Sequence, residues 1–101
     1  MPFGDIRIFE RNAKYLISAT RGGPMRAMIL RELLSKPMNA NQLSGKFGVD
    51  YKTVVHHIEV LLKMNWITRS MEKYGELFFP AFTEEEKEVF WRISAKVGKK
   101  L

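Results

Sequence analysis

The sequence predicts a mainly α-helical domain that contains one small β-hairpin. Three observations favour this class. Apolar residues recur at three- and four-residue steps over most of the chain, residues 67–79 change to the two-residue period of strands, and glycine, proline and cap-forming residues separate the segments. A chain of 101 residues forms one small domain. We therefore treat residues 1–101 as a single domain with additional helices at both ends.

The first two helices are predicted on either side of an Arg-Gly-Gly-Pro break at residues 21–24. The first occupies residues 4–20, and its apolar face consists of Ile6, Phe9, Ala13, Leu16 and Ile17. Pro24 suits the first turn of the second helix. That helix runs to about Ser35, because the residue before Pro37 is disfavoured in a helical conformation. Its core side consists of Met28, Ile29, Leu30, Leu33 and Leu34.

Two closely spaced helices are predicted next. Asn39 and Gln42 have the spacing of a capping box, and Gly48 is a natural left-handed stop for the short helix between them. Asp50 can cap a further helix over residues 51–64, after which Asn65 can take the left-handed conformation that ends it. The inward residues are Ala40, Leu43 and Phe47 in the short helix, and Val54, Ile58, Leu61 and Leu62 in the longer one.

A hairpin and a last helix complete the pattern. One strand starts at Ile67, a turn occupies residues 73–76, and a second strand over residues 77–79 ends at Pro80. Thr83 and Glu86 form a second capping box, which opens a helix that ends near residue 98. Its apolar side consists of Val89, Phe90, Ile93 and Val97.

This order of elements is typical of a winged helix-turn-helix. A short helix that glycine ends, followed within about three residues by another helix, lets the second helix project into the major groove of DNA. The predicted organisation is an N-terminal helix (1–20), a winged helix-turn-helix core (24–80) and a C-terminal helix (83–98).

Composition favours a nucleic-acid partner and excludes several other classes. The net charge of +6 and the pI near 9.8 attract polyanions. Basic residues are nevertheless spread along the chain without a run of five like charges, so DNA binding must depend on a few well-placed cations. The absence of Cys excludes disulfides, thiolate metal sites and a cysteine nucleophile. The apolar runs are too short to cross a bilayer and no signal peptide is recognisable, so we expect a cytoplasmic, nucleoid-associated protein.

The stretch from Asp50 to Ile67 resembles the recognition-helix region of ArsR-type winged-helix regulators, particularly of the archaeal branch. The matching positions are Asp50, Thr53-Val54, His57-Ile58, Val60-Leu61, Asn65 and Ile67. The resemblance extends from Pro24 to Phe79, and the terminal helices match only as elements. It implies a homodimer that binds operator DNA, with one recognition helix per subunit in successive major grooves and the wings alongside.

The same resemblance bears on metal sensing and on charge. Many members sense metals through thiolates in the helix before the recognition helix, but residues 40–47 here contain no sulfur ligand. We therefore expect no metal and no cofactor. Glu59 lies where relatives often carry a basic residue, which weakens phosphate attraction at that turn.

Three groups of residues are candidates for contact with DNA. The recognition helix offers Tyr51, Lys52, Thr53, Val55 and His56. The preceding helix offers Asn39, Asn41, Gln42 and Lys46, and the wing offers Arg69, Lys73 and Tyr74. The alternatives are an ordinary solvated face for the recognition helix, a simple helix cap for Asn39 in the preceding helix, and a soluble turn for the wing.

The adjacent histidines do not predict a metal site. Neighbours in a helix point about 100° apart, so His56 and His57 cannot readily chelate one ion. We expect His57 to be packed and His56 to face DNA or water.

The terminal helices are candidates for dimerisation, because the winged core is complete without them. The residues concerned are Phe9, Leu16, Ile17, Phe90, Trp91, Ile93 and Val97. The alternatives are packing within one subunit and, more weakly, a membrane-surface helix, which the acidic residues after Thr83 disfavour.

The residues together predict a sequence-specific double-stranded DNA-binding transcriptional regulator that acts as a homodimer. No catalytic constellation is recognisable, so we do not expect an enzyme. One alternative is a chromatin-like DNA-binding protein of low sequence specificity. Another is a winged-helix protein-interaction module, which the near balance of six basic and four acidic residues over residues 36–80 favours.

Overall fold

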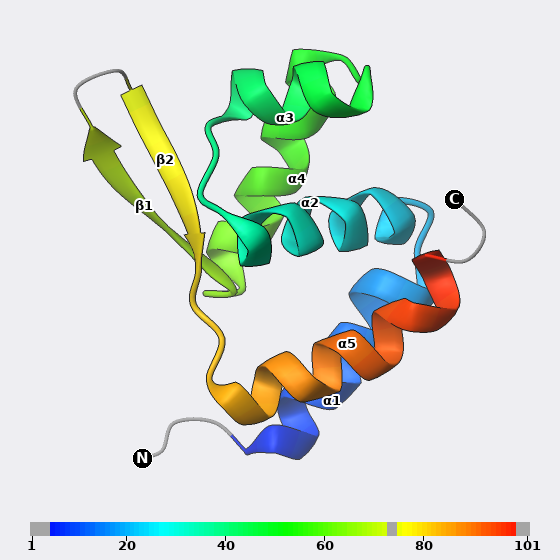
Figure 1. Ribbon diagram of the computed structural model, residues 1–101. Coiled ribbons are helices and arrows are strands. Elements are labelled where there is room, and N and C mark those ends of the chain that lie inside the picture. Colours follow the sequence, from blue (N-terminus) through cyan, green and yellow to red (C-terminus); the bar gives the residue numbers. More distant parts are fainter. Residues whose placement is uncertain (1–4, 73–74, 99–101) are drawn as a thin grey trace. The chain divides into compact units, whose positions relative to one another are not determined.

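The computed structural model describes residues 5–72 and 75–98 and consists of helices with one two-stranded sheet (Figure 1). The chain divides into two compact units: residues 29–81 form one, and residues 1–28 with 82–101 form the other. Helix α2 (Gly23–Ser35) contributes residues to both units. None of the helices in the described part of the chain is long and apolar enough to cross a membrane.

The unit that includes both ends of the chain, which we call the terminal unit, contains α1 (Ile6–Ala13), a π-helical segment η1 (Lys14–Ala19), the start of α2, and α5 (Glu84–Gly98). Helix α1 packs against α5, and Arg92 forms an ion pair of 3.3 Å with Glu10 across them. The Phe82 ring lies against Phe9 and Phe90, with ring centroids 5.3 and 5.6 Å apart. These aromatic contacts join the segment before α5 to both helices of the pair.

The predicted first helix is present, but its second half is π-helical. This widened turn leaves the Leu16 carbonyl oxygen to accept hydrogen bonds from Nε and Nη2 of Arg26, at 3.1 and 3.0 Å. The Arg26 side chain also donates to the Thr20 hydroxyl and is buried, with 6% of its surface exposed. Burial lowers the pKa of the guanidinium below its usual value. Nothing in the sequence pattern predicts this buried charge.

The unit of residues 29–81, which we call the winged unit, contains the rest of α2, then α3 (Ala40–Phe47), α4 (Tyr51–Lys63), β1 (Ile67–Glu72) and β2 (Gly75–Pro80). The two strands are antiparallel, with Ile67 opposite Pro80 and Glu72 opposite Gly75. Met38 forms an isolated bridge with Phe78, whose backbone N–H donates to the Met38 carbonyl at 2.9 Å. The segment between α2 and α3 is thereby attached to the sheet.

Most predicted inward residues are buried. In α3 and α4 they are Ala40, Leu43, Val54, Ile58 and Leu61, whereas Phe47 and Leu62 are only half-buried. In α2 they are Ile29, Leu30 and Leu33, with Met28 and Leu34 half-buried. The second strand starts at Gly75 and includes Pro80, so it is longer at both ends than predicted. Pairing of Glu72 with Gly75 extends the ladder into the predicted turn, and pairing of Ile67 with Pro80 extends it at the other end.

Candidate nucleic-acid interface

Helix α3 begins with the capping box that the sequence predicts. The Gln42 backbone N–H donates to Asn39 Oδ1 at 2.7 Å, and the Asn39 N–H donates to Gln42 Oε1 at 2.8 Å. At its other end, Gly48 has φ 62° and ψ 37°, the left-handed conformation predicted for it. Because both ends are determined by local interactions, the length of α3 and the direction in which the chain leaves it are well defined.

The turn between α3 and α4 is closed by two hydrogen bonds between Ser44 and Val49. The Ser44 hydroxyl donates to the Val49 carbonyl at 2.6 Å, and the Val49 N–H donates to the Ser44 carbonyl at 3.1 Å. Asp50 then caps α4 by accepting the Lys52 N–H at 3.1 Å, as predicted. These bonds hold the start of α4 at a defined angle to α3, as a helix-turn-helix requires.

Helix α4 has one buried side and one exposed side. The buried side consists of Val54, His57, Ile58 and Leu61. Lys52, His56, Glu59 and Lys63 are all exposed, and their spacing of four, three and four residues places them in one stripe, which we call the outer stripe. Tyr51, which is 49% exposed, and half-buried Val55 lie beside this stripe. Five predicted DNA contacts therefore remain accessible on α4, because Thr53 is also exposed.

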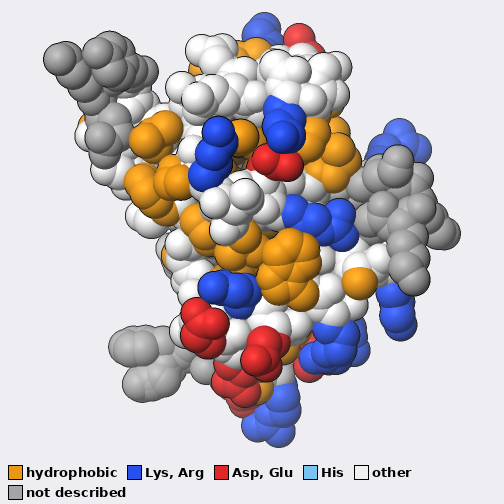
Figure 2. Space-filling view, viewed as in Figure 1, with side chains coloured by type: hydrophobic (Ala, Val, Ile, Leu, Met, Phe, Trp, Pro, Cys, Tyr) orange, Lys and Arg blue, Asp and Glu red, His pale blue; other side chains and the backbone are white. Residues whose placement is uncertain are grey.

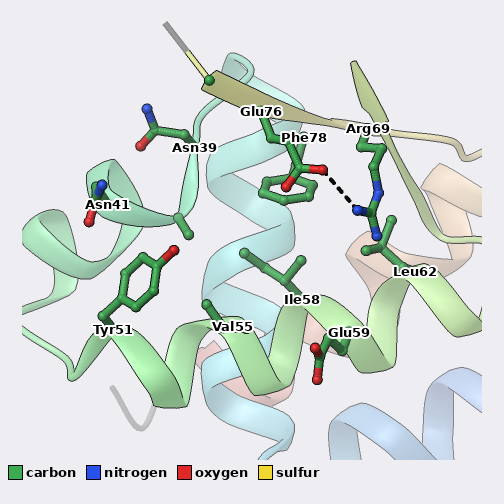
Figure 3. Close-up of a pocket in the computed structure, with 12 residues that line it drawn as sticks. Asn39, Asn41, Tyr51, Val55, Ile58, Glu59, Leu62, Arg69, Glu76 and Phe78 are labelled. Carbon is green, nitrogen blue, oxygen red and sulfur yellow. Dashed lines mark hydrogen bonds and ion pairs between the residues drawn. The ribbon is translucent and has the colours of Figure 1, made fainter. Parts of the chain in front are cut away.

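A groove of about 330 Å³ lies between α4, the start of α3 and the hairpin (Figure 3). Tyr51, Val55 and Ile58 point from α4 toward this groove, and Phe78 faces them from β2. Asn39 and Asn41 lie at its α3 end, and Arg69 and Glu76 lie at its hairpin end. The groove therefore combines an apolar interior with polar side chains from the start of α3, from α4 and from both strands of the hairpin, namely Asn39, Asn41, Tyr51, Glu59, Arg69 and Glu76.

Within the hairpin, Arg69 is paired with an acidic residue. Its Nη1 lies 2.8 Å from Glu76 Oε2, an interaction that crosses diagonally between the strands because Arg69 stands opposite Phe78. The pair is partly exposed, so DNA phosphate would have to share Arg69 with Glu76. Lys73 and Tyr74, the other predicted wing contacts, lie outside the described residues. Met71 on β1 is 72% exposed and was not among the predicted contacts.

The predicted contacts on α3 are partly occupied by interactions within the winged unit. Asn39 and Gln42 bond each other in the capping box, and Lys46 forms an ion pair of 3.4 Å with Glu32 of α2. Asn41, Gln42 and Lys46 are exposed, whereas Asn39 is half-buried. Asn41 is therefore the α3 side chain that is exposed and takes part in neither the capping box nor the ion pair.

The two histidines occupy the positions that the sequence predicts. His57 is 7% exposed on the buried side of α4, and His56 is exposed in the outer stripe. Their ring planes are tilted by 59°, with centroids 5.5 Å apart. Across the described residues, no group of three His, Asp or Glu side chains could hold a metal ion.

The predicted dimerisation residues divide into buried and exposed ones. Phe9, Ile17, Phe90 and Ile93 are buried within a single chain, and Leu16 and Val97 are half-buried. Trp91 is 43% exposed. Ile8 and Tyr15, which the sequence analysis did not select, are 48% and 63% exposed. Among the described residues of the terminal unit, the exposed large apolar side chains are therefore Ile8, Tyr15 and Trp91.

Positive charge is dispersed over the face of the molecule seen in Figure 2. Figure 2 shows Lys and Arg side chains scattered among apolar and acidic ones on the visible face, without one large basic patch. This agrees with the spread of charge along the sequence.

Comparison with known proteins supports the same fold. Residues 23–69, slightly under half of the chain, match the family described as "Bacterial regulatory protein, arsR family". A search of curated proteins gives no match.

Solved structures with a similar fold include three named proteins. NolR from Sinorhizobium fredii matches with a TM-score of 0.66 and 16% identity over 97% of both chains. The Multiple Antibiotic Resistance Repressor MarR matches with a TM-score of 0.63 and 15% identity over 99% of this chain and 78% of that one. The transcriptional regulator SlyA matches with a TM-score of 0.61 and 16% identity, and this chain spans 66% of its length. The predicted fold class, a mainly helical winged helix-turn-helix, is therefore confirmed.

Proposed function

We propose that this protein is a transcriptional regulator that binds double-stranded DNA in a sequence-specific manner as a homodimer. In this proposal α4 enters the major groove, and the hairpin lies alongside as a wing. The observation that carries the proposal is the outer stripe of α4, an exposed helix face that the capped turn from α3 holds in place. The match of residues 23–69 to the arsR family supports it, and the archaeal branch of that resemblance remains a prediction from the sequence.

In this proposal, DNA binding combines contacts to phosphates with contacts to base edges. Lys52, Lys63 and backbone amides at helix starts engage phosphates, which positions the protein without reading sequence. Side chains near the start of α4 then contact base edges, since the first turns of a recognition helix reach them. Two-fold symmetry would place the two recognition helices about 34 Å apart, one turn of DNA.

The phosphate contribution can be tested by the salt dependence of binding. Lys52→Ala should weaken DNA binding and reduce the slope of log K against log salt by about 0.9, the value for one phosphate contact on B-DNA. Lys96→Ala removes the same charge from the exposed surface of α5 and is the matched control. If Lys52→Ala leaves both affinity and slope at the control values, α4 does not lie against the DNA backbone as proposed.

The homodimer would form through the exposed apolar side chains of the terminal unit, Ile8, Tyr15 and Trp91. Light scattering should give twice the chain mass of 11.8 kDa for the wild type and a monomer for Trp91→Glu. Met71→Glu makes the same kind of change on the exposed wing and should remain dimeric. A monomeric wild type, or a Trp91→Glu variant that stays dimeric, would contradict this interface.

One observation favours a protein-interaction module as the second candidate. Lys46 and Arg69, two of the predicted DNA contacts, are paired with Glu32 and Glu76, which lowers the positive charge of the winged unit. A protein that fails to bind random duplex DNA even at low salt would support this candidate over a regulator.

A further inference from the structure

The outer stripe of α4 has an acidic residue near its middle. Glu59 is exposed, with Lys52 and His56 before it and Lys63 after it along the same face. Figure 3 shows that Glu59, which also borders the groove, projects from α4 on a different side from Tyr51, Val55 and Ile58. If α4 enters the major groove, the Glu59 carboxylate therefore accompanies it.

Glu59 has no role in holding the fold together. Within residues 5–72 and 75–98, its carboxylate takes part in no hydrogen bond or ion pair. Lys63, four residues later, is the helical position from which a lysine most readily pairs with a glutamate, and it is not within ion-pair distance. Arg69, which borders the same groove, forms an ion pair with Glu76, with Nη1 and Oε2 2.8 Å apart. The carboxylate is thus available to an outside partner.

A free carboxylate on this surface is unfavourable near DNA unless it meets a hydrogen-bond donor. Phosphates repel it, and guanine offers only the acceptors N7 and O6 in the major groove. Adenine offers an N6 amino donor, but the neighbouring N7 acceptor would repel the second carboxylate oxygen. Cytosine presents its N4 amino group and no acceptor of its own there. Cytosine is therefore the base that a glutamate accepts best.

We propose that Glu59 is a specificity-determining residue that accepts a hydrogen bond from the N4 amino group of a cytosine in each half-site. This inference rests on the proposed function, since it requires α4 to lie in the major groove. From Lys52 to Glu59 the helix rises by roughly 10 Å, the length of about three base-pair steps. The cytosine should therefore lie about three base pairs from the positions that face the start of α4.

The test is selection of bound DNA from a random duplex library by the wild type, Glu59→Gln and Glu59→Ala. Wild-type half-sites should contain one cytosine position, at which any other base weakens binding roughly tenfold. Glu59→Gln should move the preference at that position to adenine, because glutamine bonds adenine N6 and N7 together. Glu59→Ala should lose the preference there and keep the rest of the motif.

Glu88→Gln is the matched control, because it removes the same charge from the exposed surface of α5. It should bind the wild-type motif, so that a general gain in affinity from the lost charge is separated from a change in readout. If the wild type enriches a motif that Glu59→Gln and Glu59→Ala share unchanged, this inference is wrong while the proposed function stands. If the wild type enriches no half-site, or does not bind duplex DNA at all, the proposed function fails and the inference fails with it.

Discussion

The same substitution at two glycines three residues apart should change stability in opposite directions. Gly45 lies inside α3 on the exposed surface, and a Cβ added there would meet no other heavy atom within 4 Å. Alanine is favoured over glycine in a helix interior by about 1 kcal/mol. Gly45→Ala should therefore raise the free energy of unfolding by about 0.5–1 kcal/mol, since an exposed site gains propensity without new packing.

Gly48 differs from Gly45 in its backbone conformation. A Cβ there would also meet nothing within 4 Å, but φ is +62°, a region that alanine adopts at a cost of about 1–2 kcal/mol. Gly48→Ala should therefore lower the free energy of unfolding by that amount. The two variants should differ by about 2 kcal/mol, or roughly 10 °C in Tm for a domain of this size.

Urea denaturation followed by circular dichroism measures both effects, and the slope with denaturant should stay unchanged. Gly48→Asn is the control, because asparagine tolerates the left-handed region better than alanine and should lose less stability. A shift in the same direction for both alanine variants, or a Gly48→Asn variant less stable than Gly48→Ala, would refute the conformational explanation of how α3 ends.

Two further predictions concern the terminal unit. Gly23→Ala should lower the free energy of unfolding by about 2–3 kcal/mol, because its Cβ would collide with the Ile17 carbonyl oxygen, a backbone atom that cannot rotate away. Urea denaturation beside Gly45→Ala measures this loss, and wild-type stability would contradict it. The pKa of Glu10 is held below its usual 4.5 by Lys14 and then by Arg92. A lowered pKa stabilises the fold above pH 4.5, and this stabilisation is lost as pH falls through the folded-state pKa. Glu10→Gln should therefore flatten the fall of Tm in acid, and thermal melts that fall as steeply as those of the wild type would exclude this role.

The helix boundaries of the winged unit could be predicted because local interactions determine them. Asn39 with Gln42, Gly48 and Asp50 each form the cap that the spacing indicates. Such caps depend on residues at most a few positions apart, so the sequence contains the whole interaction. Asn65, with φ 60°, follows α4 in the predicted left-handed conformation for the same reason.

The terminal unit contained the features that the sequence did not reveal. Periodicity places Phe9 and Ile17 on one helix face, but it does not distinguish an α-helical turn from a π-helical one. The buried Arg26 stabilises that turn through Leu16, ten residues earlier, and no local pattern marks such a contact. Met38 likewise bridges to Phe78, forty residues later, so its burial depends on the sheet rather than on its neighbours.

The sequence predicts which side of α4 is exposed, but it does not predict which charged side chains of the candidate site are already in ion pairs. Helical spacing correctly placed Lys52 and His56 on the exposed side of α4. Pairing within the winged unit was not visible, because the partners of Lys46 and Arg69 come from α2 and from the opposite strand. The same spacing puts Glu59 on the exposed side, yet its negative charge argued against a DNA contact in the sequence analysis.

The charges near α4 limit the affinity for DNA that phosphate contacts can supply. On the described part of the winged unit, Lys46 and Arg69 form ion pairs with Glu32 and Glu76, and Glu59 adds a negative charge to the outer stripe. Few phosphate contacts imply a shallow salt dependence and weak non-specific binding. In the proposed regulator, much of the affinity would then come from base edges and from the α4 of a second subunit, since two half-sites bound together multiply modest single-site affinities. The proposed function therefore predicts that a monomeric variant should lose specific binding far more than non-specific binding.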